Sequence, residues 1–93
     1  MQVFAVVGTR SEQRQRVIQL AQSKYTEPNV YVAHDGIFVA SDGQTTKEVS
    51  RTLGIGDDDN NYTGVVVMVD HFWGYHDRDL WEWIRARSKS NGG

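Results

Sequence analysis

Residues 64–84 read GVVVMVDHFWGYHDRDLWEWI, and this stretch decides how the rest of the chain must fold. An unbroken apolar run from Val65 to Val69 leads into an aromatic turn and then into a helical pattern. All three tryptophans of the protein lie within these residues. Because so much large apolar surface is concentrated in one segment, the other elements have to pack around it.

The apolar run predicts a strand from about Thr63 to Phe72. Neither of its faces has the polar pattern of a surface that meets water. Asp77 is then expected to cap a final helix, with Asp79 in its first turn. Four residues mark the inward face of that helix, namely Leu80, Trp83, Ile84 and Arg87. We therefore expect this helix to fold back and to shield one face of the valine strand.

Length and composition limit the classes of protein that this chain can represent. Its 93 residues predict a single domain over residues 1–89, followed by a flexible tail over residues 90–93. A formal net charge of −2 gives no general attraction to nucleic acid or to an anionic membrane. The chain has no cysteine, which excludes disulfides, thiolate nucleophiles and cysteine zinc sites. No signal peptide and no bilayer-length apolar run is present, so we expect a cytoplasmic protein.

The first third of the chain reads as a strand followed by a helix. Residues 2–8 are apolar without alternation, which predicts a strand that is buried on both faces. Ser11 is expected to be the N-cap of the helix, with Glu12 in the first turn. Apolar residues then recur at helical spacing at Val17, Leu20, Ala21 and Tyr25.

The middle of the chain carries turn and capping signals. Asp35-Gly36 separates residues 29–34 from residues 37–41 and predicts a hairpin with a type I′ turn. Thr45 and Glu48 have the spacing of a capping box. Gly54 is expected to end that second helix in a left-handed conformation, with an apolar contact from the next residue.

The predicted order of elements is β-α-β-β-α-β-α. This order favours an α+β fold, a ferredoxin-like βαββαβ sandwich with an added C-terminal helix and a mainly antiparallel four-stranded sheet. The first and third strands would be central, and the second and fourth would lie at the edges. The alternative is a different strand order, in which the valine strand is central. An apolar edge strand is an aggregation hazard. We therefore also expect a homodimer that pairs through the strand from Val65 to Phe72.

The aromatic turn and the last helix form the strongest candidate contact surface. Tryptophan and tyrosine beside arginine are frequent anchors of protein–protein contacts. The alternative is that these rings only complete the core. The candidate partner-binding residues are Trp73, Tyr75, Trp81 and Arg85.

A second candidate site lies where the first strand meets the first helix. Free backbone amides there could hold an anion or a nucleic-acid phosphate together with Arg10, Ser11 and Arg14, with Arg16 nearby. Ordinary capping beside solvated arginines is the competing interpretation. The third strand, residues 36–40, lacks the RNA-recognition signature.

The sequence indicates no cofactor and no compact metal or catalytic motif. Asp57, Asp59 and Asn61 are spaced like the first ligands of a calcium loop, but Tyr62 and Met68 occupy positions that require glycine and glutamate. His71 and His76 are candidate ligands or acid–base groups of a small metal-dependent enzyme, but their spacing matches no compact helical ligand motif. Further carboxylates and a third imidazole that could approach them are Asp70, Asp77, His34 and Asp35.

The segments 64–67, 72–74 and 79–84 together resemble the C-terminal half of small uncharacterised proteins from bacteria and their phages. The resemblance covers about a third of the chain and brings no activity and no site residues. It implies a bacterial or phage origin. Many small phage proteins bind a host protein, so the resemblance favours a binder.

Our leading hypothesis is therefore a non-enzymatic protein-interaction module, a regulator or inhibitor of the phage or mobile-element type that binds a host protein. A ferredoxin-like domain that binds nucleic acid or nucleotides through Arg10, Arg14 and Arg16 is the first alternative. A small metal-dependent enzyme around His71 and His76 is the second.

Overall fold

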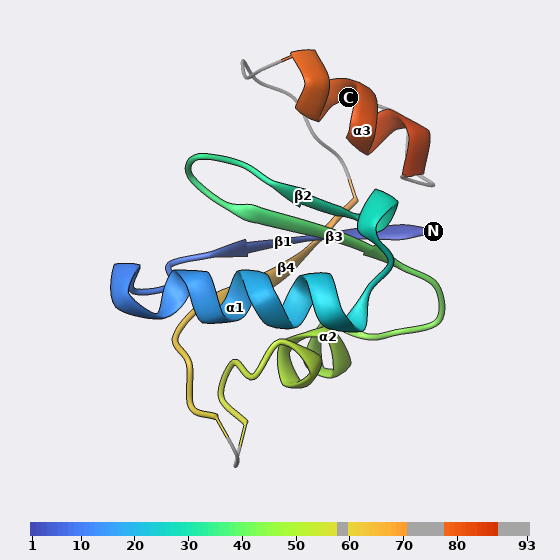
Figure 1. The fold of residues 1–93 in the computed structure, drawn as a ribbon. Coiled ribbons are helices and arrows are strands. Elements are labelled where there is room, and N and C mark those ends of the chain that lie inside the picture. Colours follow the sequence, from blue (N-terminus) through green and yellow to red (C-terminus); the bar gives the residue numbers. More distant parts are fainter. Residues whose placement is uncertain (58–59, 71–77, 88–93) are drawn as a thin grey trace.

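The computed structural model describes residues 1–57, 60–70 and 78–87. Over these residues the chain forms a four-stranded sheet and three α-helices, and Figure 1 shows their arrangement. In chain order, the elements are β1 (Gln2–Val7), α1 (Ser11–Lys24), the 3₁₀ helix η1 (Glu27–Asn29), β2 (Val30–Val32), β3 (Ile37–Ser41), α2 (Thr46–Thr52), β4 (Val65–Val69) and α3 (Arg78–Arg87). The predicted α+β class and order of elements are confirmed.

The sheet has the strand order β2-β3-β1-β4, and all neighbouring strands are antiparallel. β1 and β3 are central, and β2 and β4 are the edges, as expected from the sequence. β1 pairs Phe4 with Val39 on one side and with Met68 on the other. Its residues 3–6 are all buried. The unbroken apolar run in β1 therefore reflects a strand with both faces covered.

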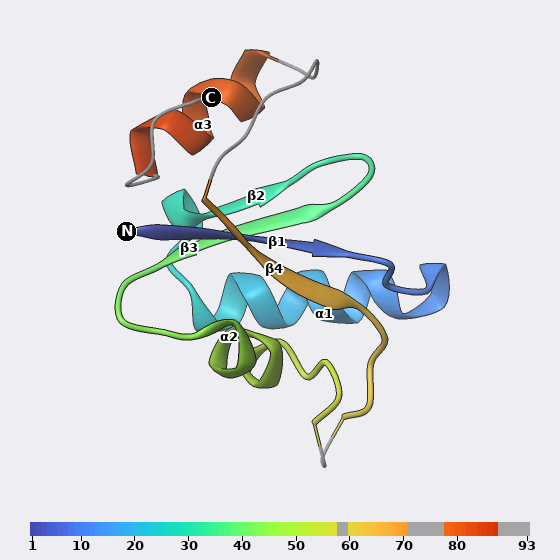
Figure 2. The ribbon, with the colours of Figure 1, turned by 180° about the vertical axis from the view of Figure 1, so that it is seen from behind.

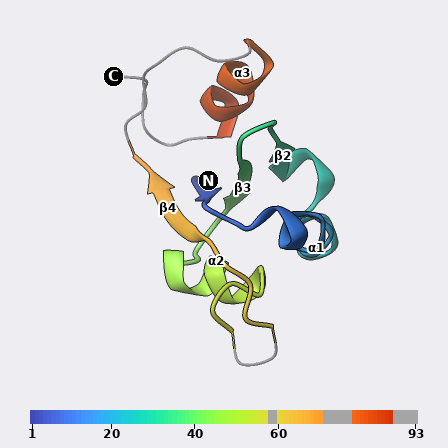
Figure 3. The same cartoon turned by 90° about the vertical axis from the view of Figure 1, so that its left-hand side faces the viewer.

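Two helices cover one face of the sheet and one helix covers the other. Figures 2 and 3 show α1 and α2 on the same side, with α3 on the opposite side. On the two-helix face, Phe4 and Val39 pack in one cluster with residues of α1 and α2. Side chains alternate along a strand, so Val3 and its partner Ala40 face α3. Both are buried, as are Leu80 and Ile84 of α3.

The start of α1 differs from the prediction. Arg10 is the N-cap, with an extended backbone and no side-chain cap, and Ser11 is already the first helical residue. The N–H of Arg10 donates to the Thr63 hydroxyl at 2.9 Å. This bond, to a residue far away in the sequence, holds Arg10 in the extended conformation of an N-cap. The helix therefore begins one residue earlier than the capping preference of Ser11 predicts.

The hairpin between β2 and β3 is confirmed, but the expected type I′ turn is wrong. Neither Asp35 nor Gly36 has a positive φ. The N–H of Ala33 donates to the carbonyl of Gly36 at 2.9 Å, so the chain reverses one residue earlier, at His34 and Asp35. The prediction was wrong because it placed the turn at Asp35-Gly36 from the local preference of these two residues alone.

Both predicted ends of α2 are confirmed. The Thr45 hydroxyl accepts from the N–H of Glu48 at 3.2 Å, and the Glu48 carboxylate accepts from the N–H of Thr45 at 2.9 Å. The bond from the Thr45 backbone N–H to the carboxylate is the main reason that the pKa of Glu48 is lowered. At the other end Gly54 has a φ of 76°, and the N–H groups of Gly54 and Ile55 donate to the carbonyls of Arg51 and Ser50. This is the Schellman pattern.

β4 begins later than predicted, at Val65 rather than Thr63. The backbone N–H and the hydroxyl of Thr63 both donate to the Gln13 side chain at 2.8 Å, so Thr63 docks on α1 instead of joining the sheet. Gly64 follows with a φ of 152°, and a Cβ there would lie 2.9 Å from the Thr9 hydroxyl. The predicted end of the strand at Phe72 lies outside the described residues.

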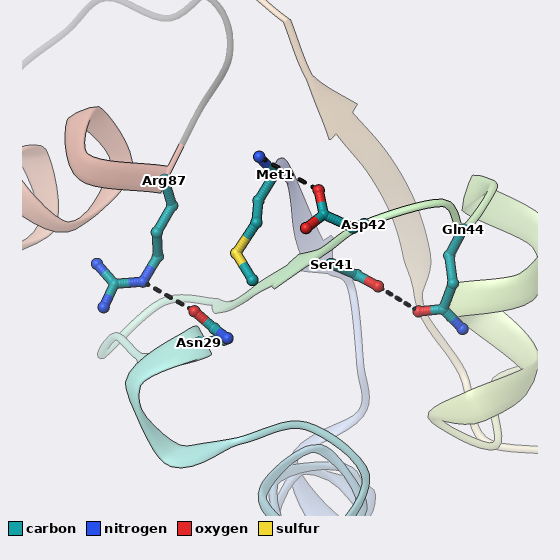
Figure 4. A network of polar contacts seen from close by, with 6 residues as sticks. All are labelled: Met1, Asn29, Ser41, Asp42, Gln44 and Arg87. Carbon is teal, nitrogen blue, oxygen red and sulfur yellow. Dashed lines mark hydrogen bonds and ion pairs between the residues drawn. The ribbon is translucent and has the colours of Figure 1, made fainter.

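A network of hydrogen bonds around the Gln44 side chain links the end of β3 to α1 and α2. The Gln44 side chain accepts from the Tyr25 hydroxyl at 3.0 Å and from the Ser41 hydroxyl at 2.7 Å. Burial raises the pKa of Tyr25. Figure 4 shows the Ser41 bond near an ion pair of 3.4 Å between the N-terminus and Asp42. These bonds connect the end of β3 to both α1 and α2.

Substitution of Gly54 by alanine is expected to destabilise the protein by about 1–3 kcal/mol, because positive φ disfavours a side chain and the site is crowded. An added Cβ would lie 3.0–3.2 Å from atoms of Tyr62, Asn60 and Leu20. Gly56→Ala is the matched control, because Gly56 also has a positive φ but has no neighbour within 4 Å of that Cβ. Urea unfolding of both variants measures the difference. Equal losses would contradict the steric part of this account.

Candidate interaction surface

The valine strand β4 lies at an edge of the sheet, and much of its apolar surface is exposed. Val65 is 58% exposed, and Val67 and Met68 are each 43% exposed. Val66 is the better buried side chain, since it packs against the core formed with α1 and α2. The last helix was expected to shield one face of this strand, but Val65 and Val67 stay exposed on the face of the sheet that α3 covers.

Helix α3 does fold back onto the open face of the sheet, but it is fixed over the strands far from β4. The indole N–H of Trp83 donates to the Pro28 carbonyl at 2.9 Å, and the Trp83 and Tyr31 rings lie 5.9 Å apart. The Arg87 guanidinium lies 4.8 Å from the Trp83 ring and donates to the Asn29 side chain at 3.3 Å. Figure 4 shows this last contact. All these partners belong to η1 and β2, at the opposite edge of the sheet.

The uncovered residues form one apolar area across β1 and β4. Val7 is 47% exposed and pairs directly with Val65, so the two side chains share a face. Val67 lies on the same face of β4 as Val65. We call Val7, Val65 and Val67 the open-face valines. Met68 projects from the other face of the strand.

No charged side chain interrupts β4, which reads Val-Val-Val-Met-Val. Natural edge strands are usually protected by lysine, proline, a bulge or a covering element. Because β4 pairs only with β1, one row of its backbone donors and acceptors faces away from the sheet. In the part of the chain that the structure describes, no other strand pairs with this outer edge of β4. This edge can therefore bind another strand through backbone hydrogen bonds and apolar contacts.

The predicted aromatic contact site is only partly within the described residues. Trp73 and Tyr75 lie outside them. Trp81 is half-buried on α3, and Arg85 is exposed on the same helix. The inward face predicted for this helix is confirmed by the burial of Leu80 and Ile84 and by the contacts of Trp83 and Arg87. The predicted cap, Asp77, is outside the described residues.

The predicted anion-binding residues do not form an open cradle. The Arg14 guanidinium donates to the Ala33 carbonyl, and the N–H of Arg10 is used by Thr63. Arg14 lines a cavity of about 50 Å³ together with Asp35, whose carboxylate disfavours a bound anion. The side chains of Arg10, Ser11 and Arg16 are exposed.

The described residues bring together no cluster of three or more side chains that could bind a metal ion. His34 is exposed at the β2–β3 turn. Asp35 is exposed at the same turn, and Asp70 is exposed just after β4. His71, His76 and Asp77 lie outside the described ranges, as does Asp59 of the acidic loop.

A hollow that the sequence did not indicate lies between the C-terminal ends of α1 and α2. Its volume is about 370 Å³, and Lys24, Arg51 and Asp57 contribute charge to its wall. The two helix ends and the loop after α2 meet only in the folded chain, so no local sequence signal could have located it.

No family model matches this chain, and no significant similarity to a curated protein or to a solved structure is found. The resemblance to small bacterial and phage proteins therefore stays a prediction. Among residues 1–57, 60–70 and 78–87, no helix combines the length and hydropathy needed to cross a membrane.

Trp83→Phe is expected to lower stability by about 1 kcal/mol, because the ring volume is largely kept while the hydrogen bond to Pro28 is lost. Thermal unfolding measures the change. Glu82→Gln on the exposed side of α3 is the control and should have a smaller effect, since its ion pair with Arg78 is exposed. If Trp83→Phe were neutral, this bond would not be what fixes α3.

Proposed function

We propose that this chain is a small non-enzymatic protein-interaction module of the cytoplasm. It self-associates through β4 and binds a host protein through α3 and the aromatic segment before it. The observation that carries this proposal is the uncharged, exposed edge strand β4. A strand that is both apolar and open at its edge binds a partner strand or aggregates, and self-association removes that hazard.

The finer assignment of the fold, a ferredoxin-like βαββαβ sandwich with an added C-terminal helix, belongs to the same proposal. It is supported by the strand order and by the position of α1 and α2 on one face. Each of these helices joins two strands that are separated by one antiparallel strand, which is the split βαβ arrangement.

The contact to a host protein is proposed for the outward side of α3. Arg85 is exposed there, and Trp81 is half-buried beside it. Tryptophan and arginine are the side chains most enriched among residues that dominate binding energy. The helix is held by Trp83 and Arg87, so its outer side is presented on a fixed support.

Self-association is tested by sedimentation of the wild-type chain and of Val67→Lys. We expect a dimer for the wild type and a dissociation constant raised at least about tenfold by the substitution, since an apolar contact is replaced by cations in both copies. The matched control is Val32→Lys. Val32 is 41% exposed on the other edge strand and should tolerate the same change without dissociation. A monomeric wild type at every concentration would overturn the proposed self-association.

Binding through α3 is tested by affinity capture from a bacterial lysate with Arg85→Glu, with the eluate checked for both protein and nucleic acid. We expect a protein that the wild type retains to be lost with Arg85→Glu. Arg51→Glu, the same charge change at an exposed position of α2, should retain it. If both variants captured the same proteins as the wild type, the role of α3 would be contradicted. Recovery of nucleic acid alone would favour the alternative function.

A further inference from the structure

We infer that the partner of β4 is a second copy of the same strand, paired antiparallel with Val67 on the two-fold axis. This inference rests on the proposed self-association and specifies its register. Two copies would then build one continuous eight-stranded sheet with α1 and α2 of both copies on the same side.

Symmetry limits the registers that are available. Directly opposite residues of an antiparallel pair project from the same face of the sheet. A two-fold axis perpendicular to the sheet keeps the helix-covered faces of both copies on one side, and it must place one residue opposite its own copy. Within the central part of β4, that residue is Val66, Val67 or Met68.

The register centred on Val67 uses the whole strand. It places Val65 opposite Val69 and Val66 opposite Met68, so every side chain of β4 meets an apolar partner. Just beyond the strand, the Asp70 carboxylate lies opposite Gly64 of the other copy. No like charges are brought together, and no charged side chain is enclosed by the apolar ladder.

The two neighbouring registers match the apolar residues of the strand less well. A register centred on Val66 would place Met68 opposite Gly64 and Val69 opposite Thr63, so the last two residues of the strand would lose their apolar partners. A register centred on Met68 would place Asp70 opposite Val66, which would bring a carboxylate into the apolar ladder. The strand is therefore complementary to itself about Val67.

The burial pattern is consistent with this arrangement. The face that bears Val65 and Val67 is the one that α3 leaves uncovered near β4. Pairing about Val67 brings both copies of these residues into a single apolar row. A partner strand of unrelated sequence would need the same pattern of apolar residues, whereas a second copy supplies it by symmetry.

The inference is tested by cysteine cross-linking, and the absence of native cysteine makes each introduced thiol unique. The variants are Val67→Cys, Val66→Cys, Met68→Cys and Val32→Cys, treated with a mild oxidant or a short bis-maleimide. Directly opposite Cβ atoms lie about 4.5–5.5 Å apart. Val67→Cys should therefore cross-link at least about tenfold faster than Val32→Cys, since paired thiols have a high effective concentration.

A mixing experiment fixes the register independently. Val65→Cys alone should cross-link slowly, because the two copies of residue 65 would be about 13 Å apart along the strands. An equimolar mixture of Val65→Cys and Val69→Cys should cross-link rapidly, because these positions lie opposite each other.

The outcomes separate this inference from the proposed function. A dimer in which Val66→Cys or Met68→Cys reacts fastest would overturn the register while leaving self-association intact. Equal rates for Val67→Cys and Val32→Cys would overturn specific pairing through β4. Fast reaction of Val67→Cys together with the Val65→Cys and Val69→Cys mixture would support the inference.

Discussion

The width of a helix is the physical constraint on which the rest of this structure depends. A helix with its side chains is about 10 Å across, whereas neighbouring strands lie about 4.8 Å apart. One helix therefore covers about two strands. The face with α1 and α2 has two helices for the four-stranded sheet, and among the residues of β4 only Met68 is a largely exposed apolar side chain there, whereas the face with α3 has one helix. Since α3 is fixed near β2 by Trp83, the uncovered part has to be β4.

Local signals were predictable from the sequence because they act over a few residues. The capping box of Thr45 and Glu48 and the stop at Gly54 depend only on neighbouring backbone groups, and both are present. The inward face of α3 was also predictable from helical spacing. The start of α1 was not predictable, because the N–H of Arg10 is held by the hydroxyl of Thr63, which is far away in the sequence. The position of α3 was missed for the same reason, since the Pro28 carbonyl that holds Trp83 carries no sequence signal.

The candidate site shows the same division. The valine run was correctly predicted to be an edge strand. Its burial was overestimated, because the helix that follows β4 in the sequence was assumed to cover β4 in space as well. Of the four aromatic-site residues, Trp81 and Arg85 are on α3, while Trp73 and Tyr75 lie outside the described residues. The interaction hypothesis now depends on an exposed apolar strand rather than on a concentration of tryptophan.

The central place of β1 also has a consequence for synthesis. Its partner β3 follows within the first half of the chain, but β4 is translated only in the last third. As the chain emerges from the ribosome, the most apolar strand pair is therefore completed late, and one side of β1 stays unpaired until then. Chaperone dependence of this small protein should be greatest during that interval.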